Sequence, residues 1–147
     1  MRTIILFTLS IALLLHTGCG DGLCRVSGTV TLDGEPLVGA FVLFTPTADE
    51  GDNATSQTDE DGRYTLQTLT GRVDGGTTPG TYVVTFSQLE SVWDGRSYFV
   101  NSQNERVPDT RAVESLPSLY TSSQTSPFTV EVRNRVETFN FDLTSGP

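Results

Sequence analysis

The chain has 147 residues and no lysine, and its 18 acidic residues outnumber nine arginines to give a net charge of −9 at neutral pH. A surface that acidic repels nucleic acid and anionic lipid headgroups, so the composition excludes nucleic acid as a partner. His16 is the single histidine in the sequence.

Residues 1–18 are typical of a signal peptide. Arg2 supplies a positively charged start, and residues 4–15 form an apolar run interrupted only by Thr8 and Ser10. That run has the length of a signal-peptide core and is too short to span a membrane as a helix. We therefore expect this segment to direct export.

The stretch "LLLHTGCG" ends in Gly18 and Cys19, which resemble the end of a bacterial lipobox. The resemblance implies that cleavage occurs before Cys19 and that this cysteine carries a lipid. Ordinary cleavage nearby and an uncleaved anchor are the alternatives, because His16 stands where a lipobox usually has an aliphatic residue. The sequence then divides into a signal peptide (1–18), an anchor and short linker (19–24) and one domain (25–147).

Cleavage before Cys19 removes Arg2 and His16, which leaves eight arginines against 18 acids and a balance of −10. Without histidine, the domain has no imidazole to act as a general base or to bind a metal. We therefore expect neither an enzyme nor a cofactor. Cys24 is predicted to be a lone thiol, or to close a short disulfide with Cys19 if the latter carries no lipid.

Alternation of apolar and polar residues begins after Cys24 and predicts half-buried strands. In "RVSGTVTL", Val26, Val30 and Leu32 share one face, and the "DG" of "LDGEPL" signals a turn. "VGAFVLFT" is apolar on both faces, which predicts a central strand. "NATSQT" is predicted to be a polar edge strand, and "RYTLQ" the strand after it.

Three further strands are predicted from the same alternation. "GTYVVTFS", "FTVEV" and "TFNFDL" each direct alternate apolar side chains inward. No helical periodicity follows residue 18, so the pattern predicts an antiparallel β-sandwich of about seven strands. The inward side chains are expected to be Tyr82, Val84, Phe86, Phe128, Val130, Val132, Phe139, Phe141 and Leu143.

Residues 88–119 are predicted to be a loop that is long for a compact domain, and such loops tend to carry function. The loop holds the only tryptophan, and its aromatic rings could stack on a sugar while polar neighbours bind hydroxyl groups. Alternatively, the aromatic side chains fold the loop back onto the sandwich as a structural flap, which we favour for the tryptophan. The candidate binding residues are Trp93, Asp94, Arg96, Tyr98, Phe99 and Asn101.

The acidic stretch "TSQTDEDGRYTLQ" fails the test for an EF-hand calcium loop. With Gly62 as the required glycine, Gln57 is a poor first ligand and Thr68 replaces the bidentate glutamate. A turn fits better, with Asp59 accepting hydrogen bonds from the backbone ahead and Gly62 in a left-handed conformation. This turn should close a hairpin between "ATSQT" and "RYTLQ". A weaker cation site remains the alternative, using Asp49, Glu50, Asp52, Asp59 and Asp61.

The segment "VSGTVTLDGEPLVGAFVLF" resembles the opening of carboxypeptidase regulatory-like domains, and "TDEDGRYTL" and "PGTYVVTF" resemble their later elements. The C-terminal region is similar to the ends of bacterial lipoproteins built on this domain, so the resemblance covers residues 25–87 and 116–143. It implies a transthyretin-like or prealbumin-like sandwich that acts as an accessory, binding or structural module. The matching positions are Gly28, Asp33, Gly34, Pro36, Leu37, Gly39, Ala40, Thr58, Asp59, Gly62, Tyr64, Pro79, Gly80 and Tyr82.

Three functions follow from these observations. We favour a non-catalytic accessory module, anchored by its lipid in the bacterial cell envelope and facing the periplasm or the cell surface, that has a structural role or binds an envelope protein. A carbohydrate-binding module that uses the 88–119 loop is the alternative. A carboxylate-dependent hydrolase is least favoured, because the acidic residues show no spacing that fixes a catalytic pair.

Overall fold

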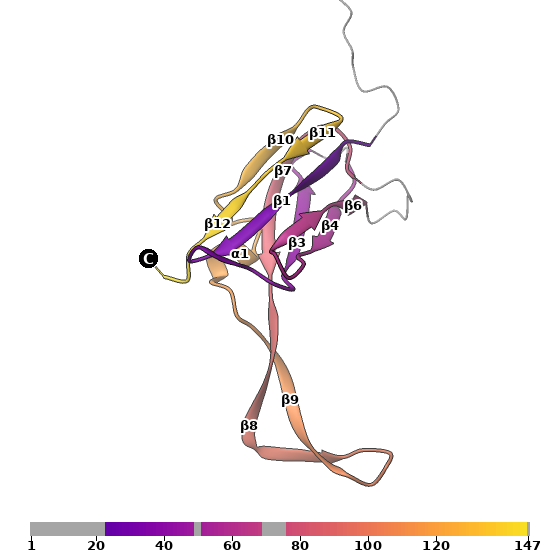
Figure 1. Cartoon of the computed structure of the whole chain (residues 1–147), viewed down its shortest axis with the longest axis vertical. Coiled ribbons are helices and arrows are strands. Elements are labelled where there is room, and N and C mark those ends of the chain that lie inside the picture. Colours follow the sequence, from indigo (N-terminus) through magenta and orange to yellow (C-terminus); the bar gives the residue numbers. More distant parts are fainter. Residues whose placement is uncertain (1–22, 49–50, 69–75, 147) are drawn as a thin grey trace, which may run out of the picture.

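The computed structural model describes residues 23–48, 51–68 and 76–146, and it confirms the all-β class. Two five-stranded sheets pack face to face, and a two-stranded hairpin projects from one end of this sandwich (Figure 1). The signal peptide and Cys19 lie outside the described residues. Within those residues no helix has the length and hydrophobicity needed to cross a bilayer.

The first sheet is built around β1, which takes neighbours on both sides. The antiparallel partners β2 and β5 lie on one side of it, and β11 and β12 lie on the other. Its strands are β1 (Arg25–Leu32), β2 (Glu35–Pro36), β5 (Arg63–Thr65), β11 (Val136–Thr138) and β12 (Phe141–Leu143).

The prediction of a purely antiparallel sandwich is wrong for this sheet, because β11 and β12 run parallel to β1. Arg25 pairs with Val136 and Val30 pairs with Phe141, so one register continues across the gap between the two short strands. Alternation along a strand does not depend on the direction of its neighbour, and the sequence pattern therefore could not reveal this pairing.

The second sheet is antiparallel and has the order β10-β7-β3-β4-β6. It contains β3, which lies between β7 and β4, so the central position predicted for "VGAFVLFT" is confirmed. The predicted edge strand β4 has the very short β6 beyond it. The strands are β3 (Phe41–Pro46), β4 (Ala54–Gln57), β6 (Gln67–Thr68), β7 (Gly80–Ser87) and β10 (Thr129–Val132).

The core lies between the two sheets and contains the side chains that alternation directed inward. Phe44 is fully buried at its centre and approaches Tyr64, Tyr82, Phe139 and Phe141 at ring-centroid distances of 6.0–6.4 Å. Such tilted and edge-to-face contacts are the arrangements that aromatic pairs prefer. Around these rings pack Val26, Val30, Val42, Leu66, Val84, Phe86, Val132 and Leu143.

The backbone of Phe139 comes very close to the backbone of β1 at Gly28. A Cβ atom at this position would lie 1.8 Å from the carbonyl oxygen of Phe139. The same oxygen accepts a hydrogen bond of 2.8 Å from the Tyr64 hydroxyl, and burial raises the pKa of Tyr64 above its ordinary value. Gly28 therefore permits the segment between β11 and β12 to approach the backbone of β1 closely.

The acidic turn has the predicted chemistry. Asp59 accepts hydrogen bonds through Oδ1 from the backbone N–H groups of Asp61 (2.9 Å) and Arg63 (2.8 Å), and Gly62 is left-handed at φ +71°. The predicted hairpin is wrong for β5, which pairs with β1; β4 pairs with β6, which begins at Gln67, the last residue of "RYTLQ". The turn thus carries the chain from the second sheet to the first.

The "DG" turn is confirmed as a two-residue connection between β1 and β2. Asp33 and Gly34 both have positive φ, at 52° and 87°, as a type I′ turn requires. Gly39 is also left-handed, at φ +72°, and it lies in the connection of residues 37–40 between β2 and β3. Pro79 immediately precedes β7, and Gly80 is its first residue.

Residues 88–119 do not form the predicted loop. They contain β8 (Leu89–Val100) and β9 (Arg106–Glu114), which pair as an antiparallel hairpin, and the start of the short helix α1 (Ser118–Thr121). The hairpin, called the arm from here on, projects away from the sandwich (Figure 1). The sequence pattern does not predict these two strands, because both faces of the arm are exposed and its side chains therefore show no alternation of apolar and polar residues.

Two left-handed glycines provide a matched test of this architecture. A Cβ atom at Gly62 would lie 2.6 Å from the carbonyl oxygen of Val30, whereas one at Gly34 would meet nothing within 4 Å. Both alanine substitutions incur the left-handed strain, but only Gly62→Ala also separates the turn from β1. We expect Gly62→Ala to lower the free energy of unfolding by at least about 1 kcal/mol more than Gly34→Ala, measured by urea denaturation. Equal effects would contradict the packing of the turn on β1.

Candidate functional site

The arm is the most exposed apolar feature in the described part of the chain. Every residue of β8 is exposed, although many are large and hydrophobic. An isolated two-stranded hairpin is marginally stable in water, so exposed apolar side chains along one favour a binding partner. They are Leu89, Val92, Trp93, Tyr98, Phe99, Val100 and Val113, with exposed fractions of 38–64%.

Glu114 fixes the arm to the sandwich. Its carboxylate accepts hydrogen bonds from the Ser87 hydroxyl (2.7 Å), the Gln88 N–H (2.9 Å) and the Leu116 N–H (3.1 Å). Burial disfavours the charged form, but these hydrogen bonds outweigh it and hold the pKa of Glu114 below its usual value. The root of the arm is thus tied by an ionised side chain.

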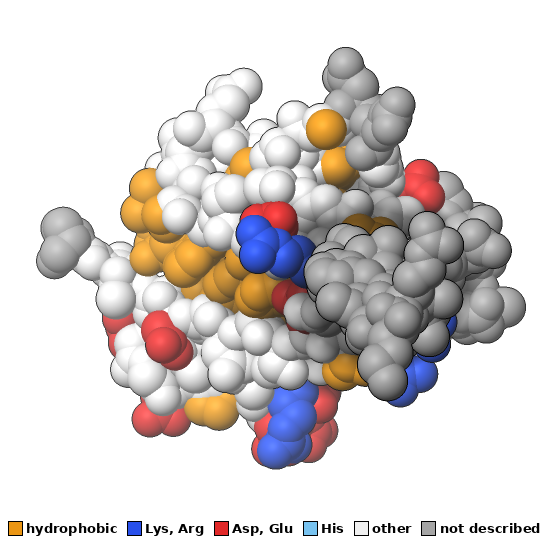
Figure 2. Space-filling model, turned by 90° about the horizontal axis from the view of Figure 1, so that it is seen from above, with side chains coloured by type: hydrophobic (Ala, Val, Ile, Leu, Met, Phe, Trp, Pro, Cys, Tyr) orange, Lys and Arg blue, Asp and Glu red, His pale blue; other side chains and the backbone are white. Residues whose placement is uncertain are grey.

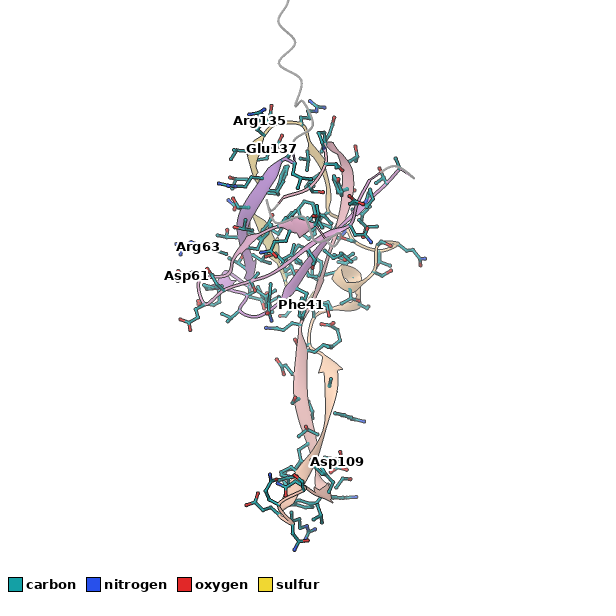
Figure 3. All side chains as sticks on the ribbon, turned by 90° about the vertical axis from the view of Figure 1, so that its right-hand side faces the viewer. Phe41, Asp61, Arg63, Asp109, Arg135 and Glu137 are labelled. Atoms are coloured by element: carbon teal, nitrogen blue, oxygen red, sulfur yellow. The ribbon has the colours of Figure 1, made fainter. Side chains whose placement is uncertain are left out.

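The arm bends where four residues of β8, Asp94 to Ser97, lie opposite the single residue Asp109 (labelled in Figure 3), so that β8 carries three extra residues. Asp94 accepts hydrogen bonds of 2.7 Å from the N–H groups of Arg96 and Ser97 and from the Ser97 hydroxyl. Gly95 supplies the positive φ, at +79°. Bulges of this kind bend the strand that contains them, and the arm changes direction before its tip (Figure 1).

An aromatic and cationic cluster lies beside this bend. The rings of Trp93 and Tyr98 meet edge to face at 5.1 Å, and the guanidinium of Arg106 lies 4.0 Å from the centre of the Tyr98 ring. The indole N–H donates to the carbonyl oxygen of Ser97 at 2.8 Å. Trp93 therefore packs within the arm, and its predicted role in folding a flap onto the sandwich is wrong.

The structure separates the other predicted binding residues. Phe99 follows Tyr98 along β8 and so occupies the opposite face of the ribbon. The Asn101 side chain shapes the tip of the arm, because its Oδ1 accepts from the N–H groups of Gln103 (3.0 Å) and Glu105 (2.9 Å). Trp93, Asp94 and Tyr98 are thus brought together, with Arg96 in the intervening bend, while Phe99 and Asn101 lie apart from them.

Sequence reasoning missed the charged residues of β9. Arg106 lies over Tyr98, and Asp109 and Arg111 follow on the same strand. The sequence signals that could have located these residues are the complementary segments "LESVW" and "TRAVE", which pair in the structure, together with the Asp-Gly turn signal at 94–95 and the polar tip at 101–105.

The acidic segment offers no built metal site in the residues that the structure describes, where no group of three potential ligands converges. Asp59 is occupied by the turn, and Asp61 forms an ion pair with Arg63 on the surface. Asp52 is half-buried, and Asp49 and Glu50 lie outside the described residues. Cys24 is fully buried, and its backbone bridges to Thr77.

Two shallow cavities lie on the sandwich itself. One, of about 300 Å³, lies on the outer face of the second sheet beside Phe41 and Leu43. The other, of about 410 Å³, lies between the α1 region, at Leu119 and Tyr120, and the segment from Thr144 to Gly146. On the end remote from the arm, acidic and basic side chains are interspersed and no basic patch is visible among the described residues (Figure 2).

Comparisons with known proteins give little help. No protein-family model matches the chain, and no curated protein matches it either. Among solved structures, a 9R-lipoxygenase from Cyanothece PCC8801 aligns with 98% of this chain and 18% of its own length, at 15% identity and a TM-score of 0.31. A likeness that weak carries no argument about fold or function.

The exposure of Trp93 can be checked in solution. With 40% of its surface exposed, Trp93 should emit at red-shifted wavelengths and be quenched by iodide. Tyr98→Ala should increase quenching further, because it removes the ring that covers one side of the indole. Blue-shifted, unquenched emission would mean that the arm folds back onto the sandwich in solution.

The bend provides a second check through Asp94. Hydrogen bonds from Ser97, followed by that from the Arg96 N–H, lower the pKa of Asp94 to about 2. A depressed pKa means that the bend gains stability above the ordinary value of 3.8 and loses it as pH falls through about 2. NMR titration of the Asp94 carboxyl carbon should therefore give a midpoint near 2, and Ser97→Ala should raise it. A midpoint close to 3.8 in the unaltered protein would show that the bend is not formed.

Proposed function

We propose that the chain is a non-catalytic module of the bacterial cell envelope, anchored by lipid on Cys19, which binds another envelope protein through its arm. The observation that carries this proposal is the exposed apolar arm held out from a well-packed sandwich. The aromatic and arginine side chains on the arm are the residue types that dominate protein–protein contacts. A transthyretin-like sandwich of the carboxypeptidase regulatory-like type, proposed from the sequence resemblance, suits such an accessory role.

A glycan is the second candidate ligand, but the polar groups expected to bind it are already engaged. Asp94 accepts three hydrogen bonds within the bend, and Asn101 accepts two at the tip. The Trp93 ring meets Tyr98 edge to face, so the two rings do not form one flat platform. Side chains used this way favour contact with apolar protein surface over recognition of sugar hydroxyls.

The binding role can be tested with an armless variant in which Asn-Gly replaces residues 91–112. Glu90 and Val113 are paired across the hairpin, so a two-residue turn can join them and leave Glu114 in place. We expect the variant to keep a cooperative unfolding transition and to lose capture of any envelope protein that the full chain binds in a pull-down. A less disruptive variant is Trp93→Ala in the intact arm, which we expect to weaken capture at least about tenfold. Undiminished capture by the armless variant would rule out the arm as the binding element.

The anchor is tested separately. Cys19→Ser should release the protein from the membrane fraction and abolish labelling by a fatty-acid analogue. Replacing Cys24 with Ser is the matched control, since it should leave both membrane retention and labelling unchanged. Membrane retention of the Cys19→Ser protein without label would mean that the signal segment remains as an uncleaved anchor.

A further inference from the structure

The outer edge of β9 is regular along its whole length. The bulge at the bend lies in β8, so Arg106 to Glu114 continue as one strand past it. The Asn101 N–H donates to the backbone carbonyl oxygen of Glu105 (3.0 Å), and the Ser115 N–H donates to that of Gln88 (2.9 Å). These two bonds show which residue pairs of the hairpin are hydrogen-bonded on each side of the bend, because such pairs alternate along an antiparallel ladder. By this alternation, the even-numbered residues of β9 direct their backbone groups away from β8.

The sequence of this strand, "RVPDTRAVE", is complementary to itself when reversed. About a two-fold axis at Thr110, Arg106 faces Glu114, Val107 faces Val113, and Asp109 faces Arg111. Opposite charges and β-branched pairs directly across a ladder are favourable, and the arrangement is the same from both sides, as a two-fold interface requires.

We propose that β9 of one copy pairs antiparallel with β9 of a second copy about Thr110, joining two arms into a four-stranded sheet. The inference goes beyond the partner binding proposed above and does not depend on it. The pairing satisfies two strand edges that are otherwise unpaired, and a sheet of four strands is stable where a two-stranded ribbon is marginal.

Charges on the arm support a second copy as the occupant. In the described parts of the chain Asp109 and Arg111 form no ion pair; the two ion pairs there are Arg63–Asp61 and Arg133–Glu131. Residues 93–111 hold three arginines and three acids, whereas the whole chain carries −9. The outer arm is therefore a region where two copies of this acidic protein can approach without net repulsion.

Pro108 is the one residue that opposes the pairing, because it lacks an N–H at the outer edge. In the proposed register Pro108 faces Ala112, so one carbonyl of each copy is left without a backbone donor. The Thr110 pair and the Arg106–Glu114 pairs keep all their backbone hydrogen bonds between the two copies. Slippage by two residues would break the charge pairing as well, so the register is specified by Asp109 and Arg111.

A charge exchange tests the proposal, using the full chain with Cys19→Ser so that lipid does not drive association. Sedimentation equilibrium should show a dimer, and Asp109→Arg or Arg111→Asp should each raise its dissociation constant about tenfold or more. The double variant Asp109→Arg/Arg111→Asp should restore dimerisation, because each arginine again faces an aspartate. A chain that stays monomeric up to about 1 mM, or a double variant no better than the singles, would overturn the inference.

Crosslinking provides an independent test of the axis. Thr110→Cys should form a disulfide between copies, because residues facing each other in a hydrogen-bonded antiparallel pair have Cα atoms about 5.5 Å apart. Ser91→Cys, on the far strand of the hairpin, is the matched control and should not crosslink. Cys24 is fully buried and should not interfere. Crosslinking of Thr110→Cys to a different protein instead of a second copy would also overturn the inference.

The two proposals fail in distinguishable ways. A monomeric chain whose capture of an envelope protein still requires the arm would overturn dimerisation and leave the proposed function intact. A dimer that is abolished by Asp109→Arg, while capture persists in the armless variant, would support the pairing and overturn the proposed function.

Discussion

The sandwich depends on the contact between Gly28 and the carbonyl group of Phe139. Because Gly28 has no side chain, the segment that joins β11 to β12 can lie against β1, and the Tyr64 hydroxyl then donates to the same carbonyl oxygen. This places Phe139 and Phe141 against Phe44 at the centre of the core. At this one position β1, β5 and the segment between β11 and β12 meet, and the second sheet packs on the surface that they form.

The sandwich and the arm follow different physical rules. Side chains of the sandwich are buried between two sheets, so its stability comes from removing apolar surface from water. The arm has no such interior and relies on cross-strand pairs, the bend at Asp94 and the attachment through Glu114. Because the arm buries so little apolar surface by itself, association with another molecule would bury more of it and stabilise the arm.

Much of the sandwich could be predicted from the sequence because burial on one face leaves alternation in the strand. Val26 and Val30 in β1, Val84 and Phe86 in β7, and Phe141 and Leu143 in β12 all follow that rule. The left-handed Asp33 and Gly34, and Gly62, were predictable from turn chemistry. The sequence could not predict the parallel direction of β12 or the place of β5 in the first sheet, since both depend on contacts between residues far apart in the sequence.

The sequence pattern predicts a loop at residues 88–119, whereas the structure has a hairpin there that carries the exposed aromatic side chains. Large aromatic side chains drew attention to Trp93 and Tyr98, whereas the hairpin that holds them shows no inside-outside pattern. The charged residues of β9 gain their significance only once the strand is seen to have an open, regular edge. Complementarity within "RVPDTRAVE" is visible in the sequence, but nothing in the sequence alone says that these residues form a strand.

The parallel register between β1 and the last two strands has a consequence for when the protein can fold. Arg25 pairs with Val136 and Leu32 pairs with Leu143, so β1 can complete its pairing only when residues 136–143 are present. Contacts so distant in sequence form late, after the cost of closing a long loop has been met. An incomplete chain keeps Val26 and Val30 without their C-terminal neighbours. A domain built this way cannot complete its first sheet until residues 136–143 have been synthesised.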